Sequence, residues 1–205
     1  MAQMRATISF CMVPSFKSVL LSLILAACIE SAAQTRVDLA SVSTVALDPN
    51  TNLNLQPKSD VGIILVAIDT CLLEVNHVPV TLEPGQRKFV HGTHAVAVSQ
   101  DGTSAALLVI VNVANITQPL TFAKIALTPG NEQIDASERN NTLLIALSPI
   151  KLQDRIDEGK DEEHAQWGSP QPIDLQRGQF VWIKPGMHQL RNRGDATANF
   201  ITIEW

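Results

Sequence analysis

Two turns in the sequence present a histidine. One is Lys184-Pro185-Gly186-Met187-His188, and the other is His91-Gly92-Thr93-His94. An imidazole can ligate a divalent metal or exchange a proton near neutral pH. A histidine in a turn needs further ligands or an orienting partner for either task, and the pair His91 and His94 is more typical of polar surface. We therefore interpret the turn with His188 as the candidate binding element and the pair His91 and His94 as polar surface, with a metal site at the pair as the alternative.

Polar and aromatic residues surround the second of these turns. Trp182 precedes His188 in a strand-like run, and Arg191 and Asn192 follow it. Arginine and asparagine can orient a polar ligand through hydrogen bonds. We predict a ligand site formed by His188, Trp182, Arg191 and Asn192. Trp182 itself is expected to pack in the core, with stacking on a ligand as the alternative.

The sequence lacks the motifs that are typical of covalent catalysis and of phosphate binding. It contains no Gly-x-Ser-x-Gly elbow and no glycine-rich phosphate loop after a strand. Cys71 lies in an apolar strand pattern, so we expect a small buried hydrophobe and not a reactive thiol. The acidic stretch within 154–172 does not have the spacing of a calcium-binding loop, and we expect it to be a solvated loop.

The candidate site residues lie in or between short apolar runs of the sequence. These runs are rich in Val, Ile, Leu and Thr and are separated by Pro, Gly, Asn and Asp, a pattern typical of an all-β sandwich or barrel. Because the runs are continuous and not alternating, we predict strands that are buried on both faces. The runs are 62–68, 105–113, 121–127, 142–147, 179–183 and 199–204.

The chain carries an internal duplication. Four blocks recur in the same order and at nearly the same spacing, for example Val45-Ala46-Leu47-Asp48-Pro49-Asn50 and Ile125-Ala126-Leu127-Thr128-Pro129-Gly130. The copies span about 43–115 and 119–205, after a linker over 34–42. The second copy has an additional charged insertion at about 154–172.

The stretch 174–205 resembles the second conserved motif of the cupin superfamily. It reads Gly178-Gln-x-Val-x-Ile-x-Pro185-Gly-x-His188-x-x-x-Asn192-x-Gly-Asp, and the first copy is similar through Pro84-Gly85-Gln86 and Gly92-Thr93-His94. The resemblance implies a bicupin: two double-stranded β-helix (jelly-roll) barrels, which here would follow an N-terminal signal helix.

Metal-binding cupins also have an earlier motif with His-x-His and a glutamate. The corresponding stretch here, 130–141, contains no histidine. The resemblance leaves His188 or His94 as one imidazole ligand, with Asp135 or Glu138 as one carboxylate. We therefore predict no cofactor and no intact metal centre, with a divalent metal at these residues as the alternative.

Residues 1–33 have the three parts of a secretory signal. A basic start with Arg5 and Lys17 precedes the apolar run 19–29, and small residues flank a cleavage site after Ala33. The run is shorter than the roughly 20 residues of a membrane-spanning helix, although a retained anchor is an alternative. Leu25-Ala26-Ala27-Cys28 resembles a lipobox, so lipidation of Cys28 is a second alternative. We expect an exported protein, periplasmic or secreted.

The charge of the chain limits its partners. The net charge is −5, and removal of 1–33 takes away two positive charges and one negative charge, which gives −6. An acidic chain without a basic run is a poor nucleic-acid binder. We expect no nucleic-acid partner, and contact with a membrane only through the signal segment or a lipid anchor.

The sequence leaves three hypotheses for function. The first is a non-catalytic bicupin that binds a small molecule or a protein partner. The second is a metal-dependent cupin enzyme, such as an isomerase, dioxygenase or hydrolase, that uses His188. The third is a scaffolding protein of the cell envelope. Homodimerisation through strand edges is compatible with each of them.

Overall fold

A computed structural model describes residues 39–55, 61–75, 77–90, 96–100, 103–114, 120–135, 141–159 and 166–204. They belong to a compact unit that spans Val37–Trp205. The predicted signal helix lies outside the described residues, as do Cys28, His91, His94 and Glu138. Nowhere in the described ranges is there a helix with the length and apolar character needed to cross a bilayer.

The regular elements of the described residues are all β-strands. Their bounds are β1 Leu39–Leu47, β2 Asn52–Leu55, β3 Val61–Ala67, β4 Cys71–Val75, β5 Val78–Leu82, β6 Arg87–Val90, β7 Val96–Gln100, β8 Ala106–Ala114, β9 Thr121–Leu127, β10 Glu132–Asp135, β11 Thr142–Ala146, β12 Ile150–Ile156, β13 Gln171–Leu175, β14 Phe180–Ile183, β15 His188–Asn192 and β16 Ala198–Glu204. The predicted all-β class is therefore confirmed.

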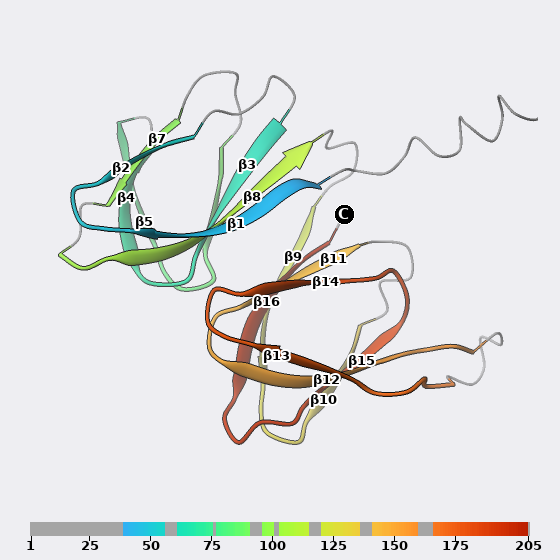
Figure 1. Ribbon diagram of the computed structural model, residues 1–205. Coiled ribbons are helices and arrows are strands. Elements are labelled where there is room, and N and C mark those ends of the chain that lie inside the picture. Colours follow the sequence, from blue (N-terminus) through green and yellow to red (C-terminus); the bar gives the residue numbers. More distant parts are fainter. Residues whose placement is uncertain are drawn as a thin grey trace, which may run out of the picture. The chain divides into compact units, whose positions relative to one another are not determined.

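The strands make two jelly-roll barrels with the same strand order. The first barrel has sheets β1-β8-β3-β6 and β2-β7-β4-β5, and the second has sheets β9-β16-β11-β14 and β10-β15-β12-β13. Each strand of the first barrel corresponds to the strand eight places later in the second. Figure 1 shows the two groups in blue to green and in yellow to red. This is the double-barrel fold that the sequence predicted.

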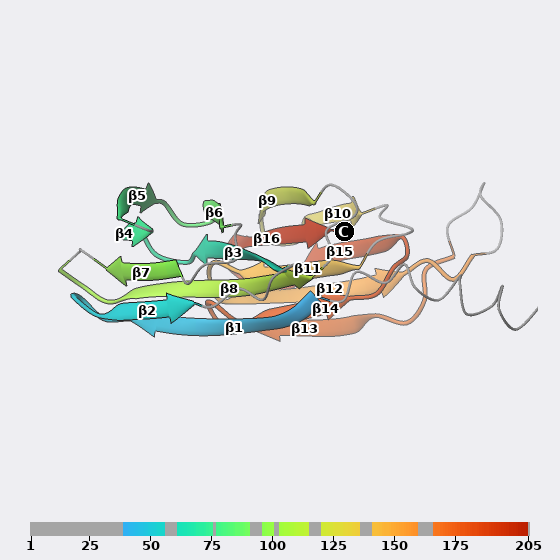
Figure 2. The same ribbon diagram turned by 90° about the horizontal axis from the view of Figure 1, so that it is seen from above.

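All strand pairs are antiparallel, and the longest ladder joins strands far apart in the sequence. β1 pairs with β8 from Leu39↔Val113 to Leu47↔Ala106, with a shift of register between Leu39 and Ser41. Figure 2 shows these two strands running side by side. A barrel built this way leaves few free strand edges.

Central strands are buried on both faces, as the continuous apolar runs predicted. On β3, Ile63 and Leu65 belong to the core of the first barrel, while Ile64 and Val66 point to the other side of the sheet. Successive side chains of a strand lie on opposite faces, so one run supplies two separate cores.

The second of these cores joins the barrels. It combines side chains of β3 and β8 with side chains of β11 and β16, two sheets that face each other. We call it the shared core; its buried members are Ile64, Val66, Ile68, Val109, Val111, Val113, Leu143, Ile145, Leu147, Ile201 and Ile203. The remaining buried residues of β11 and β16, among them Leu144 and Phe200, fill the second barrel.

Polar contacts border the shared core on both sides. Thr44 Oγ1 donates to the carbonyl of Gly178 at 2.7 Å, and Lys124 Nζ donates to the carbonyl of Pro84 at 2.7 Å. Thr44 and Lys124 directly precede the aligned blocks that begin at Val45 and Ile125, and the turns that they contact precede the equivalent strands β6 and β14. The contacts are thus related by the duplication. Arg177 and Asp69 form a further ion pair between the barrels.

Candidate functional site

An open cleft lies at one end of the second barrel, where β12, β13 and β14 meet. Its volume is about 340 Å³. The apolar wall residues are Ile156, Ile173, Val181, Trp182 and Ile183, and the polar ones are Asp154, Ser169, Gln171, Lys184 and His188. The cleft therefore offers mainly apolar surface, with a few polar groups to orient a ligand.

The alternation of β12 and β15 places two polar residues on the inner face. On β12, Ile150 and Leu152 are buried in the barrel core, so Asp154 continues the same face. On β15, His188 and Leu190 are buried. The ladder pairs β12 with β15, and Asp154 and His188 meet at the cleft end of the barrel.

Both ring nitrogens of His188 are engaged. Nδ1 lies 2.8 Å from Asp154 Oδ1 and 3.1 Å from Oδ2, and Nε2 lies 2.8 Å from the carbonyl oxygen of Lys184. The His188 side chain is 7% exposed and that of Asp154 is 16% exposed. The pair fixes the turn after β14 to strand β12.

The hydrogen bonds of this pair determine where protons lie. A carbonyl oxygen only accepts, so Nε2 of His188 carries a proton and donates it to Lys184. One further proton lies between Nδ1 and the Asp154 carboxyl group, because two acceptors would repel at that distance. Neither ring nitrogen then has a lone pair directed at a ligand in the cleft.

The hydrogen bonds of His188 make it a poor ligand for the metal site that the sequence left as an alternative. The register places Asp135 opposite His188 in the β10–β15 ladder, while Glu138 and His94 lie outside the described residues. Within the described ranges no group of three or more His, Cys, Asp or Glu side chains is arranged to hold a metal ion. His188 could ligate a metal only after breaking its bond to Asp154 or Lys184.

Trp182 lies at the cleft and not in the core. Its side chain is 43% exposed, whereas Ile183, the next residue of β14, is buried. The expectation that Trp182 packs in the core is wrong. The odd positions of β14 face the barrel core, and Trp182 falls on an even position, where it forms part of the cleft wall.

The structure separates the other two predicted ligand residues from the cleft. Arg191 is exposed on the outer face of β15, opposite to His188. Asn192 is buried, and its amide is fully used: Nδ2 donates to the carbonyls of Leu127 and Ala196 at 2.7 and 2.8 Å, and Oδ1 accepts from the Gly194 amide. Asn192 therefore fixes a turn.

Asp154 is the site residue that the sequence interpretation missed. It was assigned to the charged insertion, but β12 continues to Ile156 and β13 begins at Gln171. The spacing of Ile150, Leu152, Asp154 and Ile156 at every second residue could have placed Asp154 on the inner face of a strand. The acidic residues that follow it concealed this pattern.

Cys71 is a buried, unpaired thiol, as its apolar context predicted. It is 1% exposed and belongs to the core of the first barrel. Burial is the main cause that raises its pKa to about 11. The group is therefore protonated at neutral pH and is no nucleophile there.

Solved structures share this fold at low sequence identity. AerE from Microcystis aeruginosa is 12% identical with a TM-score of 0.60, over 80% of this chain and 86% of that chain. The conserved protein of unknown function PA5104 from Pseudomonas aeruginosa PAO1 is 12% identical with a TM-score of 0.58, over 80% and 78%. A mutant of the Bacillus subtilis oxalate decarboxylase OxdC is 9% identical with a TM-score of 0.57, over 79% and 68%.

These likenesses concern the fold alone. Together with the strand order of both barrels, they confirm the double-barrel fold that the resemblance to the cupin superfamily implied. No protein-family profile matches the chain. No curated protein matches it in sequence.

Proposed function

We propose that this protein binds a small, mainly apolar molecule in the cleft of the second barrel, without catalysing a reaction on it. The observation that supports this function most strongly is the cleft itself, with apolar walls on three strands and one carboxyl group at its inner end. Asp154 can accept a hydrogen bond from the ligand. The ligand class is therefore an apolar alcohol or amine.

The engaged state of His188 argues against a catalytic role. A general base needs a free lone pair within reach of the substrate, but the imidazole is bonded to Asp154 and to the Lys184 carbonyl. The same bonds weaken the alternative of a metal-dependent isomerase, dioxygenase or hydrolase. In this proposal the pair holds the cleft in shape.

The first barrel has a different part in the proposal. Its interior is packed with apolar side chains from β3, β4, β7 and β8, such as Leu65, Leu73, Val98 and Leu108. A filled barrel leaves no interior space for a ligand and suits a scaffolding role. We therefore assign ligand binding to the second barrel and a supporting role to the first.

A thermal-shift screen with small apolar alcohols and amines tests the function. A ligand that binds only the folded protein raises its melting temperature. We expect calorimetry to show binding that Trp182→Ala weakens at least ten-fold, because this change removes part of the cleft wall. Leu72→Ala, at an exposed position of the first barrel, is the matched control and should leave the affinity unchanged.

Two results would contradict the proposal. One is a complete lack of stabilising ligands in the screen. The other is a ligand whose affinity is the same in Trp182→Ala as in the unmodified protein, since that ligand binds elsewhere.

Export is a further part of the proposed function, and it rests on the sequence of 1–33. The intact mass of the protein recovered from outside the cytoplasm tests it. A chain that begins at Gln34 supports a soluble exported protein, and a lipid-modified Cys28 supports a membrane-attached lipoprotein. Recovery of the unprocessed chain from the cytoplasm alone would contradict export.

A further inference from the structure

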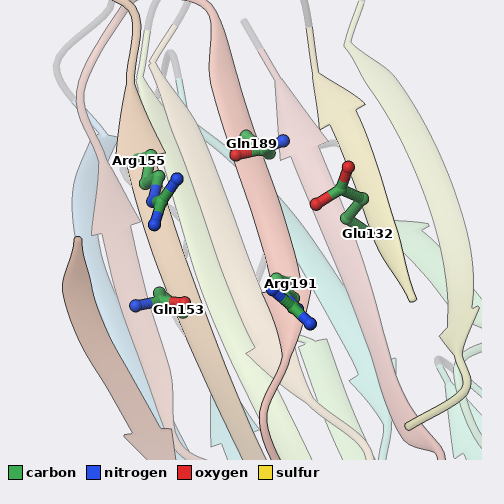
Figure 3. A pocket seen from close by; sticks show the side chains of 5 residues that line it. All are labelled: Glu132, Gln153, Arg155, Gln189 and Arg191. Carbon is green, nitrogen blue, oxygen red and sulfur yellow. The ribbon is translucent and has the colours of Figure 1, made fainter. Parts of the chain in front are cut away.

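The outer face of the second barrel carries a shallow polar hollow that is separate from the cleft. It has a volume of about 60 Å³. Five side chains line it: Gln153 and Arg155 on β12, Gln189 and Arg191 on β15, and Glu132 on β10. Figure 3 shows all five on one face of these three strands. We call this group the outer hollow.

The strand register explains why these residues meet. Gln153 pairs with Arg191, and Arg155 pairs with Gln189, so arginine and glutamine alternate in both directions across the two strands. Side chains on diagonal positions of such a ladder are about 7–8 Å apart. The two guanidinium groups can therefore reach one small ligand from two sides.

Both arginines are available for a ligand. Among the described residues, the arginines that form ion pairs are Arg177 and Arg193, and neither Arg155 nor Arg191 does so. No hydrogen bond within the described part of the chain uses the side chains of the outer hollow. Glu132 lies opposite Arg191 in the β10–β15 ladder, but the two side chains form no ion pair. Two neighbouring cations held in this way repel each other, and an anion between them would relieve this repulsion.

The composition of the outer hollow restricts the anion. Two arginines and one glutamate give a net charge of +1, which suits a singly charged group better than sulfate or phosphate. Guanidinium groups bind a planar carboxylate through paired hydrogen bonds, and the glutamine amides add donors. Glu132 would repel a second negative charge but would accept a hydrogen bond from a hydroxyl or ammonium group beside the carboxylate.

We propose that the outer hollow is a binding site for a small hydroxy acid or amino acid. The carboxylate lies between Arg155 and Arg191, and the neighbouring hydroxyl or ammonium group donates to Glu132. This site lies on the opposite face of β12 and β15 from Asp154 and His188. It does not depend on the ligand proposed for the cleft.

NMR titration of the isotope-labelled protein with lactate and alanine tests this site. Propionate lacks the donor beside its carboxylate, and sulfate is the dianionic comparison. We expect saturable shifts of β10, β12 and β15 amides with lactate or alanine, at least five-fold weaker binding of propionate, and still weaker binding of sulfate.

Three variants assign the effect to residues. Arg155→Gln with Arg191→Gln should abolish the saturable shifts, and Glu132→Gln should remove the preference for lactate or alanine over propionate. Lys151→Gln removes one positive charge at an exposed position of β12 and should leave binding within two-fold.

Several outcomes would overturn the proposal. They are the absence of saturable binding, sulfate binding as tight as that of lactate, and equal losses in Lys151→Gln and in the double arginine variant. Binding of lactate alone or alanine alone supports the site and identifies which of the two classes it takes. The amide spectrum of each variant verifies its fold independently.

Discussion

At the residue scale, the role of His188 depends on what its nitrogens contact. In the sequence it is a histidine of a cupin-like turn, but in the barrel it donates to a carbonyl and shares a proton with Asp154. In the proposed function, those contacts give His188 a structural role. The consequences concern metal content and stability.

We predict that the purified protein holds no divalent metal. Elemental mass spectrometry measures the metal content. The protein is prepared without chelator or histidine tag and is then exposed to Mn²⁺, Fe²⁺, Ni²⁺ and Zn²⁺. About one metal per chain in the protein, lost in His188→Ala, would contradict the prediction and favour the metalloenzyme.

We predict that Asp154→Ala destabilises the protein. The change removes the Asp154 carboxyl group from Nδ1 of a buried histidine, which costs about 1–3 kcal/mol. Urea unfolding measures the loss. Asp174→Ala, which removes an exposed ion pair with Arg193, is the control and should cost less than about 1 kcal/mol.

The thiol of Cys71 gives a prediction in alkaline solution. Its pKa is raised to about 11 in the folded state, while the unfolded thiol ionises near 9. Below the unfolded pKa the stability that this group contributes is fully present. As the pH rises towards 11, the thiol releases its proton in the unfolded state but not in the folded state. The free energy of unfolding therefore falls by roughly 2–3 kcal/mol.

Urea unfolding between pH 8 and 11 measures this loss against Cys71→Ala. We expect the stability of the unmodified protein to fall more steeply than that of the variant. Peptide mapping after treatment with iodoacetamide at pH 8 should also find Cys71 unmodified in the folded protein. Equal slopes, or rapid alkylation of Cys71 without denaturant, would show that the thiol is not buried.

At the element scale, the turns before β6 and β14 depend on glycine. Gly178 has φ of +79°, and a Cβ there would lie 2.7 Å from Leu107 Cδ2 of the first barrel. Gly130 has nearly the same φ, +78°, but a Cβ there would meet nothing within 4 Å. The two positions therefore separate backbone strain from contact between the barrels.

We predict that Gly178→Ala is more destabilising than Gly130→Ala. Both variants lose about 1–2 kcal/mol of stability, because alanine is strained in the left-handed conformation. Gly178→Ala loses about 1 kcal/mol more because Leu107 must move. Thermal and urea unfolding compare them. Equal losses would mean that the turn before β14 does not rest tightly on the first barrel.

At the scale of the whole molecule, the shared core makes each barrel depend on the other. Ile64 of β3 and Ile145 of β11 are both fully buried in it. An isolated barrel would expose this apolar face to water, at about 25 cal/mol for each Å². The barrels should therefore unfold together.

Two probes test this cooperativity. All three tryptophans, Trp167, Trp182 and Trp205, belong to the second half of the chain, so their fluorescence reports on the second barrel, whereas circular dichroism reports on both. We predict coincident unfolding transitions. Ile64→Ala should lower the free energy of unfolding by about 2–5 kcal/mol with both probes. Separate transitions would show that the shared core does not couple the barrels.

The all-β class and the burial of Cys71 could be predicted from local sequence patterns, and the double-barrel fold from the duplication and the resemblance of 174–205 to a cupin motif. Continuous Val, Ile and Leu runs such as 62–68 form strands buried on both faces, and glycine occupies left-handed turn positions such as Gly130 and Gly178. The cupin-like turn also located the end of the barrel that carries the cleft.

The face that each residue of the site occupies follows from the tertiary structure. His188, Arg191 and Asn192 are near in sequence, yet one borders the cleft, one lies on the outer face and one fixes a turn. Asp154 reaches His188 across 34 residues. Side chains alternate between the two faces of a strand, and the register of strand pairing sets which residues lie next to each other. A single sequence does not specify this long-range pairing.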